Sequence, residues 1–222
     1  RVADQRFLGG IGRWRDSGMV WDRPGVATAG ATLHPRAFTA DGFPEQVESL
    51  RAVVDEVRPH VVVTYAADGG YGHPDHIRAH EITMAATAES PDVRRVFHVA
   101  PSRTAVARGL AALAETDGLP FTLAPSDDLP GVEEDTITTE IDIADHMPAK
   151  ISALQAHSTQ VTVWLDEWDS GAGVGAYALT NEIAQPLLST EHYVLASGDP
   201  EGCAEDLFGG LGWGSTEPVA AR

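Results

Sequence analysis

The sequence predicts an α/β protein with a doubly wound, mostly parallel sheet and a smaller C-terminal α+β region. A β-branched run at 60–65, a Gly-rich polar loop at 66–76 and a helical pattern at 77–88 follow one another. Strand, loop and helix in this order form the repeating unit of parallel sheets, and a second strand and helix follow at 94–115. Residues 137–143 instead alternate apolar and polar side chains, which is typical of a strand with one exposed face.

The segment before the first strand divides into a loop and a helix. Residues 7–43 are rich in Gly, Pro and Arg without periodicity, and loops of this length are usually functional or disordered. Residues 44–58 carry apolar side chains three and four positions apart. This spacing predicts an amphipathic helix, which Pro59 terminates.

The elements after the Gly-rich loop are expected to complete the sheet and to build the C-terminal region. They are a strand at 94–100, a helix at 105–115, a loop at 116–135, a strand at 137–143, a helix at 147–156, a mobile insert at 164–176, a helix at 181–188 and a strand at 192–196. We therefore expect a Rossmann-like core over 1–135 and a C-terminal region over 136–222 that completes the fold.

Composition and charge narrow the classes of function. With 222 residues and 43% hydrophobic side chains, the chain can form one sizeable core. Its 15 Lys and Arg stand against 33 Asp and Glu, a net charge of −18, which disfavours nucleic acids and anionic membranes as partners. We expect no membrane segment and no signal peptide, and the single Cys203 is compatible with a cytoplasmic protein.

The strongest chemical signal is the run from Tyr71 to His76, Tyr-Gly-His-Pro-Asp-His, in the loop after the first strand. Imidazole nitrogen is a good ligand for Zn²⁺, which gives a water nucleophile at neutral pH. A second His away from the metal can donate a proton or stabilise an oxyanion, and Asp75 can fix the tautomer of that ring. In the alternative interpretation Asp75 only caps the helix, and the histidines only line a turn.

The segment PHVVVTYAADGGYGHPDHIRAH, residues 59–80, resembles the His-Pro-Asp-His motif of the LmbE-like (PIG-L) zinc N-deacetylases. Three further stretches are similar to this family, and they are LGGIGRWRDSGM at 8–19, KISALQAHSTQV at 150–161 and NEIAQPLLSTEHYVLASG at 181–198. The resemblance is greatest to the branch that removes acetate from N-acetylglucosaminyl-inositol in mycothiol biosynthesis. It implies a small amino-sugar substrate and one Zn²⁺ per chain, with Fe²⁺ as an alternative.

The resemblance also implies a role for each matching residue. His76 matches the metal-ligand histidine, and His73 matches the general acid and transition-state stabiliser. Tyr71 matches the mobile phenol that polarises the acetyl carbonyl. Asp75 matches the carboxylate that tunes His73, and Asp16 matches a carboxylate that binds sugar hydroxyls. A buried carboxylate of this kind rejects substrates that lack a hydroxyl to donate to it.

One departure from the family pattern affects the metal site. The family's Ala-His-Pro-Asp-Asp-Glu motif, with two further metal ligands and the general base, does not occur in this sequence. We therefore expect the first strand–helix unit to precede Arg1 in the intact protein and the chain as written to be inactive. His34-Pro35 lacks the carboxylates, and His80, one helical turn after His76, is expected to be a packed or hydrogen-bonded histidine rather than a ligand.

Two other functions compete with the deacetylase. The first is the related amidase that cleaves mycothiol S-conjugates, in which Pro is expected where this chain has Gly72. The second is a sugar-binding fragment without catalytic activity. The sequence does not determine the oligomeric state.

Overall fold

The computed structural model describes residues 2–23, 25–169 and 172–212, without the side chains of 167–169 and 172. Its main sheet has four strands in the order β3-β4-β9-β5. These are β3 (Val61–Tyr65), β4 (Arg95–Val99), β9 (Thr190–Gly198) and β5 (Thr139–Asp142). β3 and β4 are parallel, whereas β9 is antiparallel to both β4 and β5. The α/β class and the smaller second sheet described below confirm the predicted fold class, but the main sheet is mixed rather than mostly parallel.

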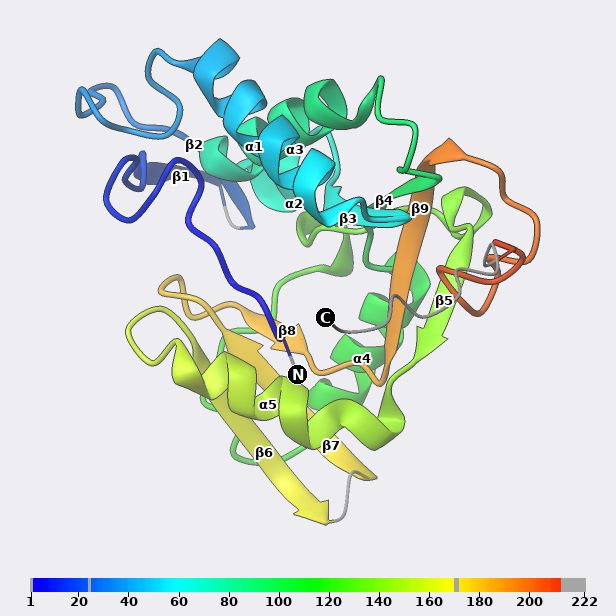
Figure 1. The fold of residues 1–222 in the computed structure, drawn as a ribbon. Coiled ribbons are helices and arrows are strands. Elements are labelled where there is room, and N and C mark those ends of the chain that lie inside the picture. The colour runs from blue at the N-terminus through cyan, green and yellow to red at the C-terminus, as the bar shows by residue number, and fades with distance from the viewer. Residues whose placement is uncertain (1, 24, 170–171, 213–222) are drawn as a thin grey trace.

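Helices α1 (Phe43–Val57) and α3 (Pro74–Thr87) pack against each other beside β3 (Figure 1). α1 begins after Gly42, carries Pro44 in its first turn and ends at Arg58, which adopts the left-handed conformation before Pro59. These positions suit helix termini because Pro lacks the amide hydrogen that an interior position needs. α3 connects the two parallel strands, as expected for a βαβ unit.

A second sheet of three antiparallel strands lies at the opposite end of the molecule, next to α5 (Figure 1). Its strands are β6 (Thr162–Asp169), β7 (Ala172–Ala178) and β8 (Ala184–Pro186). α4 (Arg103–Ala114) packs against β7 and β8, and α5 (Met147–Ala156) against β6. The core between α4 and this sheet contains Leu110, Leu113, Ala176 and Ala184.

Three expectations about local structure were wrong. Residues 164–169 and 172–176 of the expected insert belong to strands β6 and β7, whereas 170–171 lie outside the described residues. The segment expected to be a helix at 181–188 contains strand β8. Glu182 has a φ of 57°, which no right-handed helix contains, and Ala184 is buried in the core beside β7. The loop expected at 7–43 includes a hairpin of β1 (Met19–Arg23) and β2 (Val26–Ala29).

The C-terminal segment is attached to the main sheet by a buried cation. The Arg95 side chain is 1% exposed. Its guanidinium donates to the carbonyl oxygens of Asp199 at 2.6 Å, Glu201 at 2.5 Å, Leu207 at 3.0 Å and Gly209 at 2.7 Å. Buried charge is tolerated when its hydrogen bonds are satisfied, and here backbone oxygens provide them.

No helix among the described residues is both long enough and apolar enough to cross a membrane.

Candidate active site

The predicted catalytic loop joins β3 to α3 and contains the short helix α2 (Gly69–Gly72). The Asp68 carboxylate accepts a hydrogen bond from the Gly70 amide at 2.9 Å, which fixes the start of this turn. Gly69, Gly70 and Gly72 have φ values of 68°, 79° and 87°. Side chains strongly disfavour these values, so the loop follows a path that glycine makes possible.

Gly72 is also the point where the hairpin β1–β2 reaches the loop. A Cβ atom at this position would lie 2.3 Å from the carbonyl oxygen of Ala27 on β2. Non-bonded carbon and oxygen atoms do not approach each other so closely. The backbone of the hairpin therefore occupies the space that a side chain at position 72 would need. The N-terminal segment is therefore part of the site rather than a separate loop.

His76 presents one ring nitrogen to the protein and one to the site. Its Nδ1 is 3.1 Å from the Gly69 carbonyl oxygen, and a carbonyl only accepts, so Nδ1 carries the hydrogen. Nε2 then keeps a free lone pair. The ring stacks on Tyr65 at a centroid distance of 3.9 Å and an interplanar angle of 5°. Burial is the main cause that lowers the pKa of His76, which favours the neutral form that a metal requires.

His73 is held in the opposite tautomer. It is the N-cap of α3, and its Nδ1 accepts a hydrogen bond from the Asp75 backbone amide at 3.1 Å. In the neutral ring the hydrogen is therefore on Nε2, which can donate outward. The His73 and His76 rings are stacked with centroids 4.7 Å apart. One ring can thus donate a hydrogen bond beside another that offers a lone pair.

The Asp75 carboxylate joins the loop to the N-terminal segment. Oδ2 accepts a hydrogen bond from the Ser17 amide at 3.1 Å, while Oδ1 is buried and has no partner among the described residues. The contact between Asp75 and His73 therefore runs through the backbone amide rather than through the carboxylate. Asp16, next to Ser17, is exposed, and its carboxylate accepts from the Gly18 amide at 2.7 Å.

Tyr71 lies among aromatic rings. Its ring stands edge-on to His76, at a centroid distance of 5.2 Å, and stacks on Trp21 of β1 at 6.0 Å. Burial is the main cause that raises the pKa of Tyr71, and the negative charge of Asp16 adds to it. The phenol therefore stays protonated at neutral pH and can donate a hydrogen bond.

A cavity of about 330 Å³ opens next to these residues. Of the five predicted site residues, Tyr71 and His76 line it, whereas His73, Asp75 and Asp16 do not. Several other lining residues carry no signal in the sequence motifs above, and these are Trp21, Tyr65, Val99, Tyr177, Asn181 and Gln185. Tyr65 ends the strand before the loop and was detectable from that position. The others come from distant segments without a local motif.

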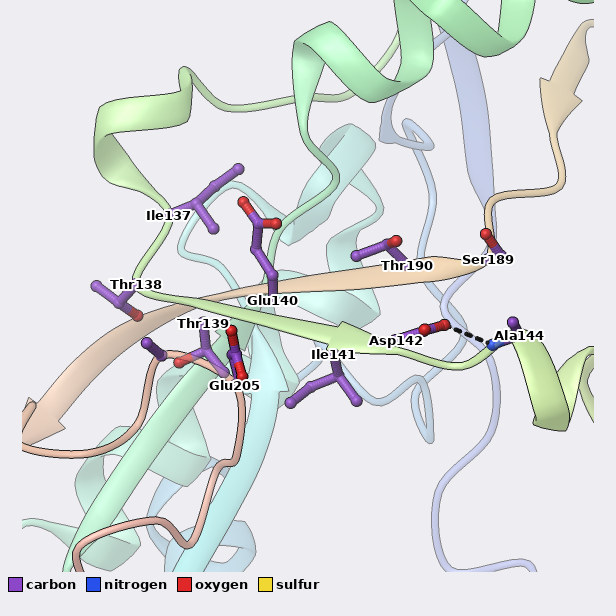
Figure 2. Close-up of a pocket in the computed structure, with 11 residues that line it drawn as sticks. Ile137, Thr138, Thr139, Glu140, Ile141, Asp142, Ala144, Ser189, Thr190 and Glu205 are labelled. Carbon is purple, nitrogen blue, oxygen red and sulfur yellow. Dashed lines mark hydrogen bonds between the residues drawn. The ribbon is translucent and has the colours of Figure 1, made fainter.

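A wider hollow of about 900 Å³ lies along β5, where Glu140, Asp142 and Glu205 are directed around the edge of the sheet (Figure 2). The Asp142 carboxylate accepts from the Ala144 amide at 2.9 Å, as the dashed line shows. The charged groups of its lining are all carboxylates. None of the predicted site residues contributes to this lining, and the hollow is not the candidate active site.

The described residues provide one suitable metal ligand, His76, but not a complete metal site. The free Nε2 and the carbonyl-bonded Nδ1 are the usual arrangement of a ligating histidine. Within the described residues, no group of three or more His, Cys, Asp or Glu side chains is placed to hold a metal ion. A catalytic zinc has about three protein ligands, so His76 would supply one of them. A ring nitrogen of His80, Nδ1, is instead 3.0 Å from the Tyr65 carbonyl oxygen, in agreement with the expected hydrogen-bonded histidine.

Comparison with known proteins identifies the family. The profile of the PIG-L family, GlcNAc-PI de-N-acetylase, matches residues 6–87. A 1D-myo-inositol 2-acetamido-2-deoxy-alpha-D-glucopyranoside deacetylase of Saccharopolyspora erythraea is 64% identical over 222 residues, which are 100% of this chain and 73% of that protein. The chain belongs to the PIG-L de-N-acetylase family. The members of this family are deacetylases, and deacetylases are hydrolases.

Two further PIG-L relatives carry the same deacetylase name. The protein of Actinosynnema mirum is 57% identical over 211 residues, which are 95% of this chain and 71% of the relative. The protein of Saccharomonospora viridis is 50% identical over 209 residues, which are 94% of this chain and 72% of the relative. The likeness to the family therefore extends well beyond the His-Pro-Asp-His segment.

Proposed function

We propose that this protein hydrolyses the acetamide of N-acetylglucosaminyl-inositol, the deacetylation step of mycothiol biosynthesis, with zinc as its metal and in the cytoplasm. The deacetylase names of relatives at 50–64% identity support the substrate. The observation in the structure that carries the proposal is the opposed pair of tautomers, with His76 offering a lone pair and His73 a donor. The family is metal-dependent, and imidazole ligation favours zinc.

Each residue of the loop has a role in this reaction. His76 binds the metal through Nε2, and the chemistry that zinc supplies when bound is a water nucleophile at neutral pH. The Tyr71 hydroxyl donates to the acetyl carbonyl and polarises it. His73 Nε2–H donates to the oxyanion that develops on the same oxygen. Asp75 acts through its backbone amide, which fixes the His73 tautomer, and Asp16 binds hydroxyls of the sugar at the rim.

The tautomer of His73 distinguishes between its two expected roles. To act as a general acid the ring must first be protonated on Nδ1, and this proton would displace the hydrogen bond from the Asp75 amide. To stabilise an oxyanion, the ring needs only the Nε2 hydrogen that the observed bond already places there. The geometry therefore supports the stabilising role more directly.

Gly72 supports deacetylation over cleavage of mycothiol conjugates. Its φ of 87° lies far from the value near −65° that the proline ring imposes. A loop with Pro at this position, as expected in the amidase, would follow another path past β2. The loop of this chain thus has a conformation that Pro at position 72 could not adopt.

The test uses the full-length protein with its metal. We expect about one Zn²⁺ per chain, loss of that metal in His76→Ala and its retention in the matched control His80→Ala. We also expect a higher kcat/KM on N-acetylglucosaminyl-inositol than on a mycothiol S-conjugate. Faster cleavage of the conjugate would replace the proposal by the amidase. A protein that never binds metal and cleaves neither substrate would be a non-catalytic sugar-binding protein.

A further inference from the structure

A second cavity of about 290 Å³ adjoins the candidate active site. The two cavities share four lining residues, which are Val99, Pro101, Tyr177 and Gln185. The catalytic loop contributes Tyr71 and His76 to the first cavity only. The second cavity continues away from this loop, towards α5 and the start of β9, where Lys150 and Glu191 line it. Together the cavities extend from the residues around Tyr71 and His76 to Lys150 and Glu191.

Two polar side chains stand where the cavities meet. Tyr177 on β7 and Gln185 on β8 are directly opposite each other in the antiparallel ladder, so both project from the same face of the small sheet. Gln185 is half-buried, yet among the described residues its amide makes no side-chain hydrogen bond. Its amide group can therefore exchange hydrogen bonds with water for hydrogen bonds with a ligand hydroxyl in the cavity.

The far end of the second cavity carries a charged network. Lys150 Nζ is 3.2 Å from Glu191 Oε1 and 3.4 Å from the Leu188 carbonyl oxygen. The Tyr193 hydroxyl donates to Glu191 Oε2 at 2.7 Å. Burial opposes the ionisation of Glu191, but the Tyr193 hydroxyl and the Lys150 ammonium outweigh it and lower the pKa of this carboxyl. The network therefore persists as an ion pair at neutral pH.

The Lys150–Glu191 ion pair can still donate and still accept further hydrogen bonds. An ammonium has three donors, and two of those of Lys150 are engaged. Each carboxylate oxygen of Glu191 accepts one bond and can accept another. A hydroxyl group donates and accepts at once, so neighbouring hydroxyls match such a pair. Because the two charges cancel, the pair gives an anionic ligand no comparable advantage.

We propose that the second cavity is the binding site for the cyclitol ring of the substrate, with Gln185 and the Lys150–Glu191 pair as its hydroxyl-binding groups. This proposal rests on the proposed function. It assigns the acetamide end to the cavity of Tyr71 and His76 and the inositol end to the cavity of Lys150 and Glu191. Gln185 lies at the junction and determines specificity for a substrate that carries a polyol on its anomeric oxygen.

The first experiment compares two substrates in the metal-loaded full-length protein. One is N-acetylglucosaminyl-inositol, and the other is the methyl α-glycoside of N-acetylglucosamine, which has a single carbon in place of inositol. We expect Gln185→Leu to lower kcat/KM on the inositol glycoside about tenfold or more, which corresponds to one lost hydrogen bond in a desolvated site. On the methyl glycoside we expect a change below about twofold. Gln155→Leu, an exposed change of the same kind on α5, should alter neither value.

Equal losses on both substrates, or no loss on either, would overturn the proposal. Tyr193→Phe is a second variant that removes one hydroxyl at the far end, and thermal unfolding checks that both variants are folded. We expect Tyr193→Phe to weaken activity on the inositol glycoside selectively, because Glu191 loses the donor that orients it.

The second experiment needs no hydrolysis. Saturation-transfer NMR with free myo-inositol should show contact with the wild-type protein and a weaker signal in Gln185→Leu. If the wild type cleaves neither glycoside but this difference is seen, the proposed function fails while the cyclitol site stands. If wild type and variant bind myo-inositol equally, or neither binds it, the cyclitol site is refuted whatever the activity.

Discussion

The carbonyl oxygen of Gly69 lies 3.1 Å from Nδ1 of His76, seven residues later in the first turn of α3. Gly69 can occupy this place because it adopts a φ of 68° and because it has no Cβ atom. A Cβ atom there would lie 3.0 Å from the His76 Cβ. A backbone group thus sets the tautomer of the candidate metal ligand, and it cannot be removed by changing a side chain. The backbone conformation of the loop therefore determines that Nε2 is the nitrogen with the free lone pair.

Replacing His73 separates its chemistry from its role as a helix cap. Asn caps helices well, so His73→Asn should keep α3 stable, whereas His73→Ala should cost about 1 kcal/mol of unfolding free energy. Both variants should keep the metal and lower kcat by about 10²–10⁴. Metal analysis, chemical unfolding and steady-state kinetics test these expectations. An unchanged kcat in either variant would contradict the role assigned to the ring.

Trp21 is expected to position Tyr71 for the reaction. Its indole stacks on the phenol at 6.0 Å, and both line the cavity of the site. Trp21→Leu should lower kcat, and Trp21→Phe, which keeps an aromatic face, should restore most of it. The exposed neighbour change Val20→Leu serves as the control. If Trp21→Leu and Trp21→Phe had the same kcat, the aromatic contact with Tyr71 would not contribute to catalysis.

Gly72 and Gly70 form a matched pair of substitutions. Both have positive φ, so Gly→Ala costs backbone strain of about 1 kcal/mol at either position. Only at position 72 would the new methyl group collide with the Ala27 carbonyl, since nothing lies within 4 Å of a Cβ at position 70. Gly72→Ala should therefore be the more destabilising change in urea unfolding. Equal losses of stability would mean that β2 does not pack against the loop.

Arg95→Lys tests how the C-terminal segment is attached. An ammonium has three donors and cannot reproduce the planar fork that reaches four carbonyl oxygens. We expect a loss of about 1–3 kcal/mol and faster amide exchange over residues 199–209. Arg94→Lys, at an exposed neighbouring position, is the control. Unchanged exchange in Arg95→Lys would show that the segment is held by other contacts.

His98 should make stability depend on pH. Its Nε2 is buried without a partner among the described residues, and burial lowers the pKa of this ring. The unfolded chain, with a pKa of about 6.5, then binds a proton more readily than the folded chain, so stability falls as pH decreases below about 7. In His98→Leu the fall between about pH 7 and pH 5 should be smaller. The midpoints of urea unfolding between about pH 7 and pH 5 measure this difference. If the midpoints of the wild type and of His98→Leu fell equally with pH, His98 would not be the cause of the pH dependence.

The sequence alone determined the elements whose signals are local. The Val-rich run ends where β3 ends, the helix expected at 147–156 has the bounds of α5, and the glycines of the catalytic loop occupy the positive φ values that only they tolerate easily. The run from Tyr71 to His76 also indicated the chemistry, because its residue types belong to metal-dependent hydrolysis. The roles assigned to Tyr71, His73, Asp75, His76 and Asp16 stay predictions, and so does the boundary between the two regions at residue 135.

Only the tertiary structure decided which distant segments complete the site. Residues 181–188 have a composition that suits a short helix, yet pairing with β7 and burial of Ala184 make them part of a sheet. That pairing places Gln185 beside Tyr177, and the hairpin β1–β2 places Trp21 on Tyr71. Such contacts depend on burial and strand pairing between segments far apart in the chain, and no local pattern of side chains encodes them.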